Sequence, residues 1–183
     1  MTEQPLASRD GMAAGITYEP IGIIHTPYGP DTVCPHQPLI PPRGEARLVI
    51  EPRWADGLYR LDSFSHVVVL FHMGRQDRDA ATRVEPPWAD GIEVGVFASR
   101  TPARPNPIGL SIVKLLRIEG NTVFTSALDA YDGTPLLDIK PYVGLLDARP
   151  DAGNGWLDKL ADREHAIDHL LGRSHHHHHH EHE

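Results

Sequence analysis

Hydrophobic and polar residues alternate over short stretches through most of this chain, and proline and glycine separate the stretches. Alternation with a period of two predicts half-buried strands, because successive side chains of a strand point to opposite faces. The stretch HVVVLFHM, residues 66–73, has no polar alternation, so we expect a central strand covered on both faces. The pattern predicts further strands at Ile16–His25, Ala46–Ile50, Ile92–Ala98, Leu110–Ile118, Thr122–Leu128 and Leu136–Tyr142.

A helix of normal length is predicted only near the end of the chain. In Gly155–Leu171 apolar residues recur near helical spacing, and Gly172 follows as a stop signal. Pro52–Leu58 fits a single helical turn. Short strands followed by one helix predict an all-β fold, a small closed or partly open β-barrel of about six to seven strands with a C-terminal helix and proline-rich loops.

The length of 183 residues is that of one domain with room for a real core. We assign this domain to residues 16–172. Residues 1–15 are small and polar without a period, which predicts a flexible N-terminus. Residues 173–183 are rich in histidine and are either a purification tag or a native tail.

Composition narrows the compartment and the partners. Cys34 is the single cysteine, so no internal disulfide can form, and neither a secretory signal nor a long apolar run is seen. These features predict a cytoplasmic protein without a membrane segment. The net charge of -8 does not favour RNA binding by bulk charge, so any RNA contact would need a local basic face. Five arginines are either phosphate contacts or part of a solvated surface: Arg43, Arg47, Arg75, Arg78 and Arg83.

The segment Gly95–Ser111 reads GVFASRTPARPNPIGLS and holds three prolines and two arginines. Proline fixes its own φ and pushes the preceding residue to extended backbone, so this loop is stiff before a ligand arrives. Such a loop suits a polar, partly anionic small molecule, because little ordering entropy is lost on binding. The turn Arg104–Pro107 is expected to brace the loop.

A second polar segment, Leu128–Tyr142, reads LDAYDGTPLLDIKPY. Its Asp-Gly-Thr-Pro at 132–135 is typical of a turn. Asp138, Lys140 and Tyr142 follow at alternate positions, so on a strand they point to one face. That face is either a solvated edge or a site.

Other kinds of site are not favoured. Gly153-Asn154-Gly155 does not follow a strand and lacks the third glycine of a dinucleotide-binding loop. No Gly-x-Ser-x-Gly elbow of a serine hydrolase is present. The four histidines between residues 25 and 72 are too far apart in sequence for the spacing of metal ligands, and Cys34 has no second cysteine near it. We therefore predict no metal site.

Several short motifs occur in a specific order: Pro35-His36-Gln37-Pro38, Phe64-Ser65-His66, Gly95-Val96-Phe97-Ala98, Arg104-Pro105-Asn106-Pro107-Ile108-Gly109, Asp132-Gly133-Thr134-Pro135 and Asp138-Ile139-Lys140-Pro141-Tyr142. With these motifs the chain resembles the TsaA-like family, also called YaeB or TrmO, from about residue 21 to residue 142. The resemblance implies a compact β-barrel that binds S-adenosylmethionine outside the Rossmann architecture, usually as a homodimer. It also implies methylation of N6 of threonylcarbamoyladenosine, the modified base next to the anticodon of tRNA.

The resemblance also implies a set of site residues. The expected cofactor-binding residues are Pro35, His36, Gln37, Met73, Gly74, Arg100, Leu110, Asp132, Gly133 and Thr134. Arg100 is the candidate partner of the methionine carboxylate, since a guanidinium and a carboxylate are both planar forks. Asp138, or Tyr142 made acidic by Lys140, is the candidate acceptor of the N6 proton, although water can also take it.

Two alternatives stay open at this point. The methyl acceptor could be another RNA or a small molecule, because the ends of the chain are acidic. The protein could also be a sensing or adaptor module that binds the cofactor and transfers nothing.

Overall fold

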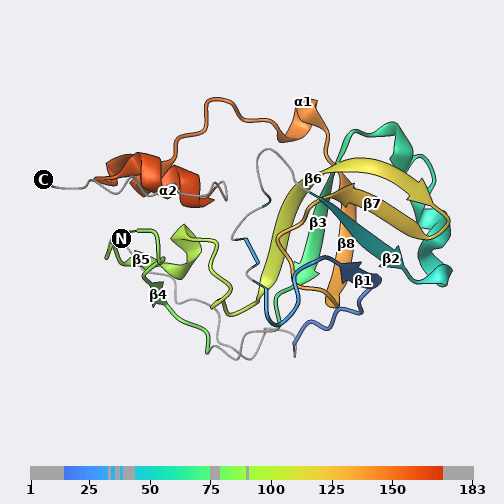
Figure 1. The fold of residues 1–183 in the computed structure, drawn as a ribbon, viewed down its shortest axis with the longest axis horizontal. Coiled ribbons are helices and arrows are strands. Elements are labelled where there is room, and N and C mark those ends of the chain that lie inside the picture. The colour runs from blue at the N-terminus through green and yellow to red at the C-terminus, as the bar shows by residue number, and fades with distance from the viewer. Residues whose placement is uncertain are drawn as a thin grey trace, which may run out of the picture.

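The computed structural model describes residues 15–32, 34–35, 38, 44–74, 79–89 and 91–170. Six strands form a closed antiparallel barrel in the order β1-β2-β7-β6-β3-β8, as Figure 1 shows. Their bounds are Gly22–His25 (β1), Glu45–Ile50 (β2), His66–His72 (β3), Ile108–Glu119 (β6), Thr122–Ser126 (β7) and Thr134–Pro141 (β8). The predicted all-β barrel is therefore confirmed in its closed form.

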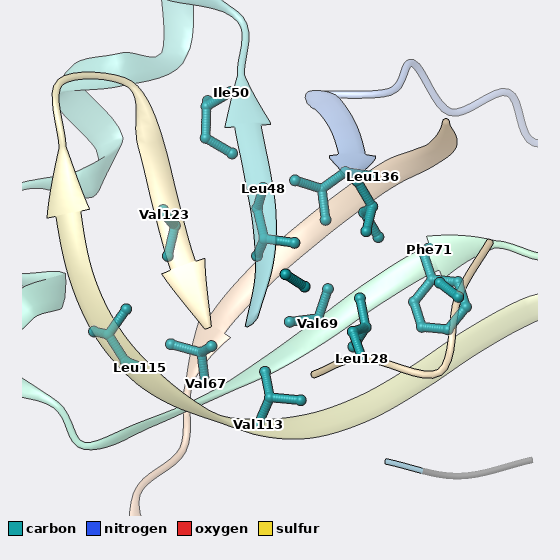
Figure 2. Packing of buried hydrophobic residues seen from close by; sticks show 13 residues of the cluster. Leu48, Ile50, Val67, Val69, Phe71, Val113, Leu115, Val123, Leu128 and Leu136 are labelled. Carbon is teal, nitrogen blue, oxygen red and sulfur yellow. The ribbon is translucent and has the colours of Figure 1, made fainter. Parts of the chain in front are cut away.

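The core fills the interior of the barrel. Alternate residues of each strand point inward, so Leu48, Val67, Val69 and Leu136 are fully buried. Figure 2 shows these side chains, which come from β2, β3 and β8, lying close together inside the barrel. Burying a side chain of this size contributes about 1.5–3 kcal/mol, so this layer holds the barrel together.

The central strand lies where the pattern predicted, because β3 pairs with β6 on one side and β8 on the other. Its expected burial on both faces was wrong. Val67, Val69 and Phe71 point inward, whereas Val68 and Leu70 lie half-buried on the outer face. The reason is geometric: in a small closed barrel only the inner face of each strand points into the core.

The hairpin predicted around Gly120 is present. β6 and β7 pair across it, and Gly120 has φ 60°, a conformation that glycine adopts without strain. The predicted helical turn is also present, as the 3-10 helix η2 (Pro52–Leu58), which is followed by η3 (Leu61–Ser63).

Two predicted strands are much shorter than expected. β1 begins only at Gly22, and Ile16 and Tyr18 before it are exposed, so they have no core to join. In place of a strand at Ile92–Ala98, Val94–Gly95 (β5) pairs with Arg83–Val84 (β4) outside the barrel, and Val96–Ala98 forms the 3-10 helix η4. Arg104 donates to the carbonyl oxygen of Val96, which folds the chain away from an extended path.

The C-terminal helix is interrupted. Gly155–Lys159 forms the 3-10 helix η5, and Arg163–Leu170 forms α2. Leu160 between them has extended backbone, and its side chain is buried. The helix is therefore interrupted at the residue whose apolar side chain is buried. A short helix α1 (Gly144–Asp147) precedes them, and residue 171, the expected end of the helix, lies outside the described residues.

Of these elements, η5 and α2 lie beside β4 and β5 and form a side lobe with residues 79–89 and 91–104 (Figure 1). Trp156 stacks on Trp88 with ring centroids 5.5 Å apart, and its indole N–H donates to the carbonyl oxygen of Ala98 at 2.8 Å. The side lobe buries Ala89, Val96, Ala103, Leu160 and Ala166. In the described part of the chain, no helix is both long and apolar enough for a membrane crossing.

Candidate site at the loop end of the barrel

The strand register brings three loops to one end of the barrel. At this end His25 of β1 pairs with Arg47, and Glu45 of β2 pairs with Ser126. His72 pairs with Ile108 at the same end. The arm 26–44, the segment 73–107 and the turn 127–133 therefore all leave the barrel here, and we call this the loop end. The opposite end, with η2, η3 and Gly120, is the far end.

Hydrogen bonds attach the arm to the turn. The hydroxyl of Thr26 donates to the carbonyl oxygen of Ala130 at 2.7 Å. The backbone N–H of Asp132 donates to the carbonyl oxygen of Tyr28 at 2.8 Å. These two hydrogen bonds fix the start of the arm to the turn 127–133.

The proline-rich loop is held from inside. The Arg104 guanidinium donates to the carbonyl oxygens of Val96 and Ser99 at 3.0 and 2.8 Å, as expected of a brace. The backbone N–H of Met73 donates to the carbonyl oxygen of Pro107 at 2.8 Å, which ties the end of β3 to this loop. Gly109 lies against the ring of Phe71, where a Cβ would clash. The loop therefore presents Arg100 from a fixed backbone.

Asp132 is an exposed carboxylate with local partners. Its Oδ1 lies 3.0 Å from His25 Nδ1 and accepts the backbone N–H of Thr26 at 3.2 Å. The bond to His25 is the main reason that the pKa of Asp132 lies below its usual value. Next to it, Gly133 has φ 78°, and Thr134 is buried with its hydroxyl donating to the carbonyl oxygen of Tyr131.

Asp129 is a site residue that the sequence did not single out. Its carboxylate accepts a short hydrogen bond from the hydroxyl of Ser111, which points into the barrel and is fully buried. Burial raises the pKa of Asp129 to about 6, although the hydrogen bond from Ser111 and the charge of Arg100 both act to lower it. The sequence did contain an indication of this role, because Asp129 directly follows the predicted strand 122–128 and a carboxylate is unusual beside a buried strand.

Two side chains of the arm lie near enough to Asp129 for its charge to raise their pKa values. The thiol of Cys34 is half-buried, and burial together with the Asp129 charge raises its pKa to about 12. The pKa of Tyr28 is raised by burial and then by Cys34 and Asp129. Asp129 is therefore the group on which the arm, the proline-rich loop and β6 converge.

The other expected cofactor residues are distributed around this point. Pro35 lies half-buried on the arm, whereas His36 and Gln37 fall outside the described residues. Met73 packs against the barrel core, and Gly74 follows it at the surface. Leu110 points to the outer face of β6, opposite Leu70 of β3, and is 48% exposed.

The three expected catalytic residues do not gather at the loop end. Asp138 and Lys140 lie on the outer face of β8 and pair with each other at 2.7 Å. Tyr142 follows β8 at the far end, where its backbone N–H donates to the carbonyl oxygen of His66. At about 3.3 Å per residue, Tyr142 is more than 20 Å along the strand from Thr134.

Only two of the five candidate phosphate contacts lie among the described residues. Arg47 is exposed on β2, and Arg83 is exposed but pairs with Glu93 at 2.7 Å. Arg43, Arg75 and Arg78 fall outside the described residues. Within the described ranges, His, Cys, Asp and Glu form no group of three able to hold a metal ion.

A closed antiparallel barrel with a polar site between the loops at one end defines a small β-barrel protein, and among the described residues its strands do not alternate with helices as in a doubly wound nucleotide-binding fold. The chain belongs to the tRNA-methyltransferase O N-terminal domain family, whose model matches residues 23–148, so the resemblance found in the motifs is confirmed.

Individual relatives agree with this assignment. A probable S-adenosyl-L-methionine-binding protein of Pyrococcus abyssi is 42% identical over 144 residues, covering 79% of this chain and 77% of that protein. A tRNA (adenine(37)-N6)-methyltransferase of Mus musculus is 38% identical over 141 residues, or 74% of this chain, but the chain spans only 33% of the mouse protein. The crystal structure of TrmO from Pseudomonas aeruginosa superposes with a TM-score of 0.64 at 35% identity, covering 78% of this chain and 62% of that one.

Proposed function

We propose that this protein is an S-adenosylmethionine-dependent methyltransferase that acts on N6 of the adenine at position 37 of tRNA. We further propose threonylcarbamoyladenosine as the acceptor. The observation that carries the proposal is the meeting of three loops at one barrel end, around Arg100, Asp129 and Asp132, in a member of this family.

The residues at the loop end suit the cofactor. Arg100 offers a cationic fork to a carboxylate, and Asp132 offers an exposed oxygen to a ribose hydroxyl. The loop that carries Arg100 is already held by Arg104 and Trp156, so binding orders little additional chain.

When bound, S-adenosylmethionine supplies a methyl group on a positively charged sulfur, which is already activated for transfer. The task of the protein is then to hold donor and acceptor in line, for which a stiff loop is suited. The target base lies in the anticodon loop and is unpaired, so exposing it costs little. Backbone carbonyls of the arm segment 35–37 are the proposed contacts of the adenine amine.

The proton of N6 must leave during transfer, and Asp138 or Tyr142 beside Lys140 is the proposed acceptor. In one copy of the chain these residues do not lie at the loop end. For them to act, a second copy has to bring its β8 to this loop end, so the catalytic trio and the homodimer form a single proposal.

The outer face of the barrel supports this homodimer. β6 places four apolar side chains outward, each 40–48% exposed: Ile108, Leu110, Ile112 and Leu116. An antiparallel sheet normally shows polar side chains on its open face. Leu110 belongs both to this face and to the expected cofactor site, and opposite charges on Asp138 and Lys140 border the face. A second copy related by a two-fold axis presents the same combination and is therefore the proposed occupant.

The acceptor is tested with purified protein and labelled cofactor. We expect label transfer to tRNA that carries threonylcarbamoyladenosine, and mass analysis should locate the added methyl on that nucleoside. Unmodified tRNA and a small-metabolite extract are the matched controls. Transfer to either control instead would refute the proposed acceptor, and cofactor binding without transfer to any of them would favour a non-catalytic binding module.

A further inference from the structure

A partly buried carboxylate and an exposed guanidinium act on each other at the loop end. Asp129 lies in the turn after β7, held by the hydroxyl of Ser111 from β6. Arg100 comes from the proline-rich loop, and its positive charge favours the ionised form of Asp129. Two segments distant in sequence thus bring opposite charges together at the mouth of the barrel.

The Asp129 carboxylate is incompletely compensated. Its pKa stays near 6 even with the Ser111 hydrogen bond and the Arg100 charge, because burial removes more solvation than these groups return. The other titratable groups that face it, Tyr28 and Cys34 of the arm, remain neutral around pH 7 because their pKa values are raised. An added cation at this point would therefore be strongly stabilised.

We propose that Asp129 binds the α-ammonium group of the methionine part of S-adenosylmethionine, while Arg100 binds the α-carboxylate. This inference rests on the proposed function, because it takes the cofactor as given. An α-amino acid carries both charges on one carbon, so its recognition needs an anion and a cation close together. Asp132 is the weaker candidate, because its Oδ1 is already shared by His25 and the backbone N–H of Thr26.

Calorimetric titration of the wild type and of Asp129→Asn tests the assignment. At pH 7.5 we expect the variant to bind S-adenosylmethionine and S-adenosylhomocysteine at least about tenfold more weakly, since both carry the α-ammonium group. Binding of 5′-methylthioadenosine should not change, because that molecule lacks the amino-acid part. Asp62→Asn, an exposed aspartate of η3 at the far end, is the matched control and should bind all three ligands normally.

The pH dependence of binding gives a second readout. Protonation of Asp129 removes its charge, so wild-type affinity for S-adenosylmethionine should fall as the pH is lowered from 7.5 to 5, by about tenfold for one unit below the pKa. The affinity of Asp129→Asn should be nearly independent of pH over this range. This profile decides the question if 5′-methylthioadenosine binds too weakly to measure.

The possible failures can be told apart. If Asp129→Asn binds S-adenosylmethionine as tightly as the wild type, the ammonium assignment is overturned and the proposed function stands. If the variant loses 5′-methylthioadenosine as strongly as S-adenosylmethionine, Asp129 has only a structural role. If the wild type binds no S-adenosylmethionine, the proposed function itself fails. Thermal unfolding of each variant confirms that it is folded.

Discussion

The charge of Asp129 is expected to lower the stability of the fold and to strengthen cofactor binding. Its pKa of about 6 lies above the usual value of 3.8, so the fold favours the neutral acid. The resulting loss of stability develops as the pH rises from about 4 through 6 and persists above. Asp129→Asn keeps an acceptor for Ser111 and removes the charge, so it should raise the free energy of unfolding at pH 7.5 by about 2–3 kcal/mol. Denaturant unfolding should show this gain at pH 7.5 and almost none at pH 4.

Asp132→Asn is the matched comparison three residues further on. The pKa of Asp132 is lowered, chiefly by His25, so its ionised form stabilises the fold above its unfolded pKa and this contribution is lost as the pH falls. Its amide variant should therefore be less stable than the wild type at pH 7.5, the opposite sign. Equal losses in both variants would mean that the charge of Asp129 does not destabilise the fold.

At the scale of elements, the loop that presents Arg100 depends on the side lobe. Trp156 stacks on Trp88 and binds the carbonyl oxygen of Ala98, two residues before Arg100. Trp156→Ala should speed amide hydrogen exchange in residues 96–101 and weaken cofactor binding, while β3 and β6 stay protected. Trp54→Ala removes an exposed tryptophan of η2 at the far end and should leave both readouts unchanged. Faster hydrogen exchange throughout the barrel would contradict the prediction that Trp156 supports only the loop that carries Arg100.

The same elements show what a sequence can and cannot predict. Strands with regular alternation, such as β2, β6 and β7, were placed to within two residues, because the period of two records which face is buried. Val94–Gly95 and the interrupted helix at Leu160 were not placed correctly, because the stacking of Trp156 on Trp88 and the burial of Leu160 override the local pattern there. The sequence did not predict Asp129 as a site residue for a similar reason, since its burial depends on segments that are distant in sequence.

At the scale of the whole molecule, the barrel is closed, but part of its outer face is both apolar and exposed. Leu110 and Ile112 of β6 lie opposite the half-buried Leu70 and Val68 of β3, and these four side chains form an outward apolar surface. Closure has removed the exposed strand edges, so the association that this surface favours is face to face and does not extend the sheet. That geometry can place β8 of one copy near the loop end of another, as the proposed catalytic role of Asp138, Lys140 and Tyr142 requires.

The oligomeric state tests this arrangement. Wild-type protein should sediment as a dimer at micromolar concentration, and Ile112→Glu should be a folded monomer, because a charge in the centre of an apolar interface cannot be solvated. The monomer should bind S-adenosylmethionine more weakly, since Leu110 lies on the same face, and should lose most methyl transfer if Asp138, Lys140 and Tyr142 act across the interface. Leu145→Glu changes an equally apolar, 95% exposed side chain on α1 and should remain dimeric and active. A wild-type monomer with full activity would refute both the interface and the catalytic role of the trio.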